Sequence, residues 1–471
     1  MDELQEIFAL GDISAIITAL KVKANIVVPS WDVLLKQYEP MEHEILKDDQ
    51  TLKDKTRKDG SVEPSARIVV GLEKLLSRRV DEFTFSIPVK RVYANTDNEA
   101  RQKISKSIEA IYANAHINAE NLRRGLAYYA SCEIFTIWYA VKKPNTLYGF
   151  KSNYKLKCKT YSPMNGVLLF PYINDLDDML AMSLQYTKKI GTKEYTYFET
   201  YTANKHYIWK QGAGAKGWEP VNDPEGDDIV LMKIPGAYIN RHQPVYYGLT
   251  ALRKEIEYTL SRNSNVIAYN SAPVIKVAGA IKGQEDKGES YRIWRVENGG
   301  DVSYVSWSQS IEASKYHVDT MLKLYWMQAQ MPDLSFENMK GLGNIGYDAR
   351  QTLLTDAHLK IGDEAGPLVE FFEREFNVIK AFLKIISDYK EEDIDAVTAE
   401  HVITPYIQND ELNEINKRMK ANGGKAIESQ LESIQRYGES DNPQETLEQI
   451  QKEDSAESLA RANAFNVNNQ I

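Results

Sequence analysis

Two stretches near the middle of the chain place apolar residues at every third or fourth position. The first runs from Tyr247 to Asn270 and the second from Ser310 to Gln330, and this spacing predicts two helices that each bury one face. Between them, from Pro273 to Ser306, short runs alternate apolar and polar residues around glycines, which predicts strands. The pattern therefore predicts a two-helix stalk that carries a small β-rich tip.

The apolar stripes of these two helices have no evident partner beyond each other. A pair of helices alone buries a poor fraction of its surface, so a free stalk needs further contacts. Packing side by side with other copies of the chain in a ring would supply them. The alternative is an ordinary helical hairpin that docks on the core of its own chain, and the pattern does not separate the two.

The region before the stalk is predicted to combine helices with a β-rich part. Asp12 is placed to cap the first of these helices, and residues 47–66 read as a charged loop. The predicted helices are Ile13–Lys23, Trp31–Tyr38, Ile68–Leu76, Glu99–Asn114 and Asn118–Ala130. Runs of β-branched and aromatic residues predict strands at Ile134–Val141, Val167–Tyr172, Met182–Lys188, Glu194–Thr202 and His206–Lys210.

The region after the stalk is predicted to be mainly helical. One long helix extends from Tyr347 to Tyr389, with a kink where Gly362 and the pair Gly366-Pro367 interrupt it. Val402 to Thr404 is predicted to be a short strand. The remaining helices are predicted at Asp410–Asn422, Lys425–Tyr437 and Pro443–Ala464.

The composition is that of an ordinary globular protein with an acidic balance. The 471 residues are 43% apolar and 26% charged, and the formal net charge is −10. A protein that grips nucleic acid over a broad face is usually basic, and an acidic chain can surround DNA only as a surface that guides it without holding it. Cys132 and Cys158 are expected to be reduced thiols. No stretch approaches the roughly 20 apolar residues that span a membrane.

The run Gly341–Gly346 spells G-x-G-x-x-G and raises a dinucleotide-binding enzyme as an alternative. Such a site needs the run directly after a strand and at the start of a helix. Here a predicted helix that ends near Met331 precedes it instead. We interpret the glycines as a loop that changes its backbone angles easily, with Asn338 and Lys340 as its polar side chains.

The sequence contains no recognisable constellation of catalytic residues, and no cofactor or metal site is predicted. The glycine-rich loop at Gly212–Gly217 lacks the Ser or Thr that a phosphate-binding loop needs after its Gly-Lys pair. Asp175, Asp177 and Asp178 make an acidic turn, for which cation binding and a helix-capping turn are both open. The histidines do not cluster with the cysteines, so no zinc pattern exists.

Several stretches of the chain, in this order, resemble the portal proteins of tailed bacteriophages. The stretches are Tyr38–Ile45, Pro64–Pro88, Ser162-Pro163 through the Asp175 turn, the hairpin Tyr197–Trp209, Ile234–Leu252, Met331–Ser335 with the glycine loop and long helix, and Glu428–Glu445. The resemblance covers nearly the whole chain, and the order of the pieces is more specific than any single piece.

The resemblance implies an α+β, portal-type fold with an α/β wing, a two-helix stem, a small α/β clip, a long kinked helix and a helical crown. The implied parts are the wing at residues 1–243, the first stem helix at 244–272, the clip at 273–307, the second stem helix at 308–330, the tunnel loop at 331–346, the kinked helix of the wing at 347–400 and the crown at 401–471.

The resemblance also implies a function. A non-enzymatic, dodecameric ring would sit at one capsid vertex of the virion, after assembly in the host cytoplasm, and double-stranded DNA would cross it during packaging and ejection. The implied partners are the large terminase, the head-tail adaptor, and the major capsid and scaffolding proteins, with no membrane. Another head or tail connector ring is the main alternative.

Only a few basic contacts with DNA are expected, because an arginine-lined wall would hold a polymer that carries about one charge per 1.7 Å of axis. The candidates in the tunnel loop are Asn338, Lys340, Gly341, Gly343 and Asn344. The candidates on the stem are Arg253, Lys254, Arg262, Lys315 and Lys323, and those for partner docking at the clip are Arg292, Trp294 and Arg295. For each of them, a solvated charge or a salt bridge between subunits is an equal alternative.

Overall fold

The computed structural model describes residues 3–22, 26–56, 59–176, 178–270, 274–278, 281–286, 292–296, 301–305, 309–334, 352–406, 420, 429–437 and 443–468. The chain divides into two compact units, Met1–Ile345 with Ala349–Tyr406 and Gly346–Asp348 with Ile407–Ile471. We call them the main unit and the C-terminal unit. None of the described helices is both long enough and apolar enough to cross a membrane.

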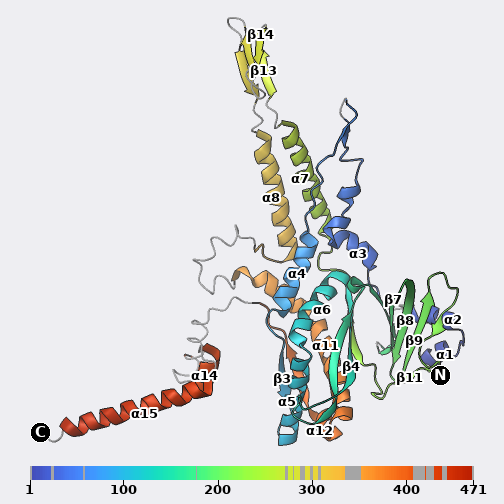
Figure 1. Cartoon of the computed structure of the whole chain (residues 1–471), viewed down its shortest axis with the longest axis vertical. Helices are drawn as coiled ribbons and strands as arrows, with labels where there is room; N and C mark the ends of the chain where they lie inside the picture. Colours follow the sequence, from blue (N-terminus) through green and yellow to red (C-terminus); the bar gives the residue numbers. More distant parts are fainter. Residues whose placement is uncertain are drawn as a thin grey trace. The chain divides into compact units, whose positions relative to one another are not determined.

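The main unit mixes helices and strands (Figure 1). Its α-helices are α1 (Glu3–Phe8), α2 (Ile13–Leu20), α3 (Trp31–Tyr38), α4 (Leu72–Phe85), α5 (Glu99–Asn114), α6 (Ile117–Ser131), α7 (Thr250–Asn270), α8 (Gln309–Ala329), α11 (Thr355–Ile386) and α12 (Glu391–Ala396). Its longer strands are β3 (Lys90–Ala94), β4 (Glu133–Asn145), β5 (Ser152–Tyr161), β6 (Val167–Ile173), β7 (Met179–Ile190), β8 (Lys193–Thr202), β9 (Lys205–Gly212), β12 (Gly236–Asn240) and β17 (Thr398–Val402).

A three-stranded antiparallel sheet in the order β12-β4-β5 forms the centre of the main unit. Its two faces are both covered, because successive side chains of a strand point to opposite sides. Trp138 and Leu156 pack against α5 and α11 on one face. On the other face, Phe135 and Ile137 pack against the second sheet, for example against Leu184.

The second sheet has the order β10-β9-β8-β7-β6, with β10 at Glu219–Pro220, and β11 (Asp227–Asp228) also pairs with β9. One face of this second sheet packs against the central sheet, and α2 packs against its other face. Ile17 and Leu20 of α2 pack against Phe198 and Trp209 there. Asp12 caps α2 as expected, because its carboxylate accepts a hydrogen bond of 3.1 Å from the Ala15 amide.

Most predicted elements of the main unit are confirmed. Helix α5 has the expected bounds, because Asn98 accepts from the Arg101 amide at 2.8 Å and so caps its first turn. Helices α7 and α8 match the two stalk helices within three residues at each end. The five predicted strands correspond to β4, β6, β7, β8 and β9.

Three local expectations are wrong. Residues 66–71 are not helical, and α4 begins only at Leu72. The charged segment 47–66 contains a short hairpin of β1 (Lys55–Thr56) and β2 (Val62–Glu63). The predicted strand at Val402–Thr404 lies earlier, because β17 ends at Val402 after pairing with β3.

The acidic turn at Asp175 connects β6 to β7 and caps no helix, so that alternative is also wrong. The side chain of Asn174 closes the turn, since its oxygen accepts from the Leu176 and Asp178 amides at 3.0 and 2.8 Å. Asp177 lies outside the described residues. Among those that are described, no three His, Cys, Asp or Glu side chains are placed to hold a metal ion.

The insert between α7 and α8 contains two antiparallel strand pairs. The outer pair is β13 (Val274–Ala278) with β16 (Asp301–Val305), and the inner pair is β14 (Ile281–Asp286) with β15 (Arg292–Val296). Strands were expected here, at β13 and β15. A helix was implied as well, but the described residues of the insert are all in strands.

The long helix and the C-terminal unit are mainly helical where they are described, with bounds that differ from those predicted. Helix α11 ends at Ile386 instead of Tyr389 and contains both Gly362 and Pro367. The kink stays a prediction, and residues 347–351 of the predicted helix lie outside the described part.

In the C-terminal unit, α14 (Gln430–Tyr437) begins after the non-helical Ser429, and it is in contact with α15 (Pro443–Asn468). Apart from Lys420, the predicted helix Asp410–Asn422 lies outside the described residues. Ser429 and Glu432 form a capping box on α14, with each side chain accepting from the other's amide, at 3.2 and 2.9 Å.

A buried ion pair joins α6, α11 and the central sheet. Arg124 donates to both oxygens of Glu375, at 2.7 and 2.9 Å, and the indole of Trp138 donates to the same carboxylate at 2.9 Å. Burial disfavours the charge on Arg124, but Glu375 outweighs it and keeps the pKa of the guanidinium above its ordinary value. Replacing one partner would leave the other as an uncompensated buried charge.

We therefore expect Arg124→Met to lower the free energy of unfolding by about 3–5 kcal/mol. Denaturant unfolding followed by circular dichroism measures it. Arg123→Met is the matched control, because the neighbouring Arg123 side chain is 78% exposed. The double variant Arg124→Met/Glu375→Leu should lie closer to the wild type than the single variant. Equal effects of Arg123→Met and Arg124→Met would contradict the role of the pair.

Candidate functional site

Helices α7 and α8 lie side by side as an antiparallel pair, the predicted stalk (Figure 1). At the base, Ile256 of α7 and Tyr325 of α8 are fully buried in the core of the main unit. Further up, Ser314 donates to Asn263 at 3.2 Å and so links the two helices. The pair thus docks on its own chain at the base and leaves that core toward the insert, and packing against other copies of the chain stays a prediction.

A buried network of four charged or polar side chains fixes α7 at this base. Arg253 donates to Glu257 at 2.5 Å and to Glu73 of α4 at 2.9 Å. His43 Nδ1 lies 2.6 Å from the other oxygen of Glu257, and its Nε2 lies 3.0 Å from the Gln37 carbonyl. The two ring nitrogens of His43 thus face the Glu257 carboxylate on one side and a backbone carbonyl on the other.

An extended segment, residues 66–70, runs along α7 beside this network. Its alternate amides donate to side chains four residues apart on the helix: Ala66 to Asn265 at 2.8 Å, Ile68 to Ser261 at 2.8 Å and Val70 to Glu257 at 2.9 Å. The spacings match, because two extended residues span about 6.6 Å and four helical residues span about 6 Å. The side chains of α7 thus supply the acceptors that a neighbouring strand would offer.

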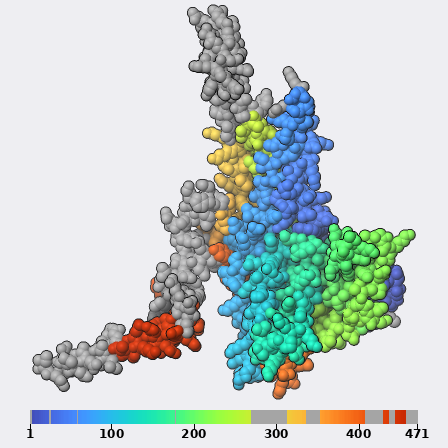
Figure 2. Space-filling view, viewed as in Figure 1, coloured from blue at the N-terminus to red at the C-terminus, as the bar shows by residue number. Residues whose placement is uncertain are grey.

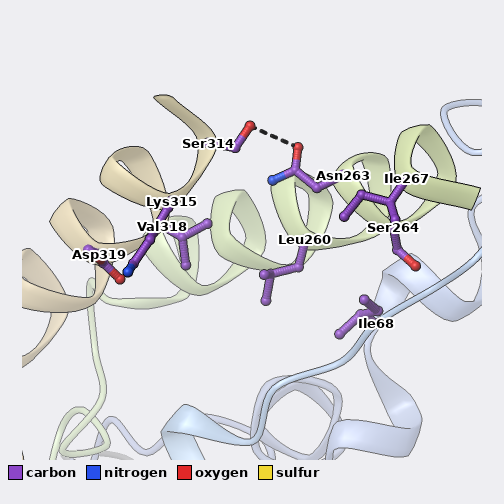
Figure 3. Close-up of a pocket in the computed structure, with 9 residues that line it drawn as sticks. All are labelled: Ile68, Leu260, Asn263, Ser264, Ile267, Ser314, Lys315, Val318 and Asp319. Atoms are coloured by element: carbon purple, nitrogen blue, oxygen red, sulfur yellow. Dashed lines mark hydrogen bonds between the residues drawn. The ribbon is translucent and has the colours of Figure 1, made fainter. Parts of the chain in front are cut away.

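The upper part of the stem has a groove of about 430 Å³ between α7, α8 and the extended segment (Figure 3). Ile68, Leu260, Ile267 and Val318 form its apolar part. Ile267 is 55% exposed. The polar residues that line it are Asn263, Ser264, Ser314, Lys315 and Asp319.

The predicted DNA-facing cations of the stem fall into different environments. The prediction that Arg253 faces the DNA is wrong, because this side chain is buried in the network with Glu73 and Glu257. Helical periodicity cannot show whether a polar position faces a buried partner. The ammonium of Lys254 lies 2.8 Å from Glu44, and the guanidinium of Arg262 lies 5.8 Å from the centre of the Tyr258 ring.

Lys315 and Lys323 differ from these cations. Both are exposed on α8, about two turns apart. Neither forms an ion pair with any residue that the structure describes. Asp319 lies between them on the same face and is also exposed, so this surface of α8 carries both signs of charge.

The backbone of the predicted clip residues lies on β15, in the inner strand pair. Arg292 pairs with Asp286, Trp294 with Gln284 and Arg295 with Gly283 across the two strands; their side chains lie outside the described part. The tunnel-loop residues Asn338, Lys340, Gly341, Gly343 and Asn344 also fall outside it. Residues 330–334, which lead into this loop from α8, are not in a strand, so the context that a dinucleotide fingerprint needs is not met.

The two cysteines are free thiols, as expected. Burial raises the pKa of Cys132 to about 12 and that of Cys158 likewise to about 12. Thiols that stay protonated at neutral pH are poor nucleophiles and poor metal ligands. They serve here as small apolar side chains, Cys158 within the core between α5 and α11.

The order of the helix pair, the insert and the long helix along the chain agrees with one family. The family model "Phage portal protein, SPP1 Gp6-like" matches residues 28–459, so the chain belongs to this family of phage portal proteins. No curated protein matches the chain. A portal protein is a non-enzymatic component of the virion. It forms an oligomeric ring at a capsid vertex and is the conduit for DNA.

Within the network at the stem base, the Glu257 carboxylate contributes a pH dependence of stability with a defined sign. Burial opposes the charge on Glu257, but hydrogen bonds from His43, the Val70 amide and Arg253 outweigh burial and lower its pKa. The folded pKa is therefore below the unfolded value of about 4.3. The stability that this carboxylate contributes is complete above about pH 4.3 and is lost as the pH falls through the folded pKa.

We expect Glu257→Gln to lower the free energy of unfolding at neutral pH by about 3 kcal/mol, because it leaves Arg253 and His43 without their shared carboxylate. The variant should also lose less stability than the wild type on acidification below about pH 4.3. Denaturant unfolding at a series of pH values measures both effects. Glu255→Gln, an exposed position on the same helix, is the control. Parallel pH profiles for wild type and Glu257→Gln would refute this account.

Proposed function

We propose that α7 and α8 are the stem that surrounds the DNA channel, that residues 273–307 are the clip and that residues 331–346 are the tunnel loop. Residues 1–243 and 347–400 would then form the wing, and residues 401–471 the crown. The observation that carries this assignment is the helix pair itself. Its base is held by the buried network and its far end continues into the paired strands of the insert. Only the stem has this arrangement within the described residues.

The groove on the stem supports a specific way of building the ring. Its apolar side chains, Leu260, Ile267 and Val318, have room for further contacts, and a second copy of the chain is the partner that a ring places beside every stem. We assign the groove to the stem of the neighbouring subunit in a dodecamer. Burial of such a surface stabilises assembly by about 25 cal/mol for each Å² of apolar area.

The charges of the stem suit a channel through which DNA slides. Lys323 is the best candidate for phosphate contacts, because it is exposed, has no described ionic partner and does not line the groove. Lys315 is also exposed, but it lines the groove that the neighbouring stem would cover. Lys254 and Arg262 are weaker candidates, since Glu44 and Tyr258 already contact them. Few contacts keep counterion release small, so each step along the DNA has a low barrier.

The insert is the proposed docking site for other proteins of the virus. Arg292, Trp294 and Arg295 on β15 would contact the large terminase during packaging and the head-tail adaptor afterwards, since arginine and tryptophan are enriched at the centres of protein interfaces. The major capsid and scaffolding proteins would contact the wing and crown during assembly in the host cytoplasm. In this account the glycine loop serves the channel and binds no dinucleotide.

We expect Ile267→Asp to weaken ring assembly without unfolding the subunit. Ile267 is 55% exposed in the groove, so the subunit loses little, whereas the interface would have to bury an unpaired carboxylate. Native mass spectrometry and negative-stain imaging would then show fewer rings at a given concentration. Ile190→Asp is the matched control, because Ile190 is 54% exposed at the β7–β8 turn. Normal rings from Ile267→Asp would place the subunit contact elsewhere.

Deletion of Asn338 to Asn344 tests the tunnel loop. We expect rings to form, because the deletion leaves the stem and its base intact, and DNA packaging to fail. Ring formation is followed by imaging, and packaging by the amount of DNA protected from nuclease in assembled heads. A deletion of residues 213–217, in the loop after β9, is the control. Packaging at the wild-type level would show that this loop is not needed in the channel.

A further inference from the structure

One region of this acidic chain is entirely free of acidic residues. Residues 134–174 contain no Asp or Glu but six lysines, Lys142, Lys143, Lys151, Lys155, Lys157 and Lys159, while the whole chain has a net charge of −10. The lysines belong to strands β4 and β5 and to the turn that joins them. None of the six forms an ion pair with a residue in the part of the chain that the structure describes. We call the three of them that share one face of β5, Lys155, Lys157 and Lys159, the lysine surface.

The strand geometry gathers three of these lysines on one face. Lys155, Lys157 and Lys159 occupy alternate positions of β5 and pair with Val141, Tyr139 and Ile137 of β4. Alternate residues point to the same side of a strand and are about 6.6 Å apart. The intervening residues of β5 point to the opposite side, where Leu156 is part of the buried core.

The same face is open to solvent over part of its length. At one end Ile137 is buried against the second sheet. Beyond it, Tyr139 and Val141 are 39% and 37% exposed, and Lys157 and Lys159 are exposed beside them. Figure 2 shows this part of the chain, in teal, at the surface of the main unit.

We infer that the lysine surface binds the phosphate backbone of duplex DNA, as a second DNA-binding surface on elements separate from the stem and the tunnel loop. Three lysines in line span about 13 Å, along which DNA presents several phosphates, at about one charge per 1.7 Å. Lysine acts as a point charge without base specificity. The inference uses the family's DNA cargo and does not depend on the stem, clip or loop assignments.

The lysines could instead protect the edge of the sheet from association or bind an acidic protein. Each of these two roles explains fewer of the observations than DNA binding does. Lysines on an edge strand prevent association with other sheets, and β5 is an edge strand. That reason does not extend to Lys142 and Lys143 on β4, or to the absence of every acidic residue over 41 positions. An acidic protein partner would also fit the charge, but lysine is depleted in protein interfaces, whereas DNA-binding interfaces are strongly positive.

The test measures the affinity of the assembled, full-length protein for a labelled duplex of mixed sequence at several salt concentrations. The variant is Lys155→Gln/Lys157→Gln/Lys159→Gln. The control, Lys188→Gln/Lys189→Gln/Lys193→Gln, removes the same charge from exposed positions around the β7–β8 turn. We expect the variant to bind at least about tenfold more weakly at about 0.1 M salt, and its salt slope to fall by up to about 2.7, which is 0.9 for each lost phosphate contact.

Three results would overturn the inference. The first is unchanged affinity of the variant, whether or not it aggregates, since aggregation alone would assign the lysines to edge protection. The second is an equal loss in variant and control, which would show a general effect of net charge. The third is binding of polyglutamate, but not of duplex DNA, through the same three lysines, which would indicate an acidic protein partner. Imaging of rings for both variants separates loss of binding from loss of assembly.

Discussion

The buried carboxylate of Glu257 is the point at which three parts of the chain meet. It accepts from His43 of the N-terminal region, from the Val70 amide of the extended segment and from Arg253 of its own helix. A charge in this position is tolerated only with all of its partners, because the desolvation of an unpaired carboxylate is costly. The direction in which α7 leaves the core is therefore fixed by polar contacts, which specify geometry more narrowly than apolar packing does.

These contacts at the base of α7 supplement the packing of the two helices against each other. The stem buries little surface beyond its base, and its groove leaves Ile267 largely exposed in the single subunit. The subunit thus gains its stability in the main unit, from cores such as the one around Trp138 and Glu375. In the proposed ring, the stems of neighbouring subunits would supply the remaining contacts. Folding and assembly are in this way supported by different contacts, so either can be perturbed alone.

The elements that were predicted correctly are those whose capping residues and apolar spacing match the way they pack in the fold. Helix α5 was found with its bounds because Asn98 caps it and its isoleucines recur at helical spacing. Residues 68–71 were assigned to a helix because Ile68, Val69 and Val70 are apolar, but side chains of α7 accept from the amides of Ile68 and Val70. Such acceptors lie almost 200 positions away and leave no local pattern. Arg253 was misassigned for the same reason, since its partner Glu73 is equally distant in sequence.

In the two proposals made above, the distribution of charge on the described surfaces separates the sliding of DNA from its binding. Motion of DNA along a wall requires weak, mixed charge, and the exposed face of α8 alternates lysine with Asp319. Retention of DNA requires several cations without acidic neighbours, because each phosphate contact adds to both affinity and salt dependence. The β4–β5 region meets the second requirement and the stem the first. The average charge of −10 therefore describes neither surface. An acidic portal can guide DNA at one place and bind it at another, provided that the cations are segregated by fold.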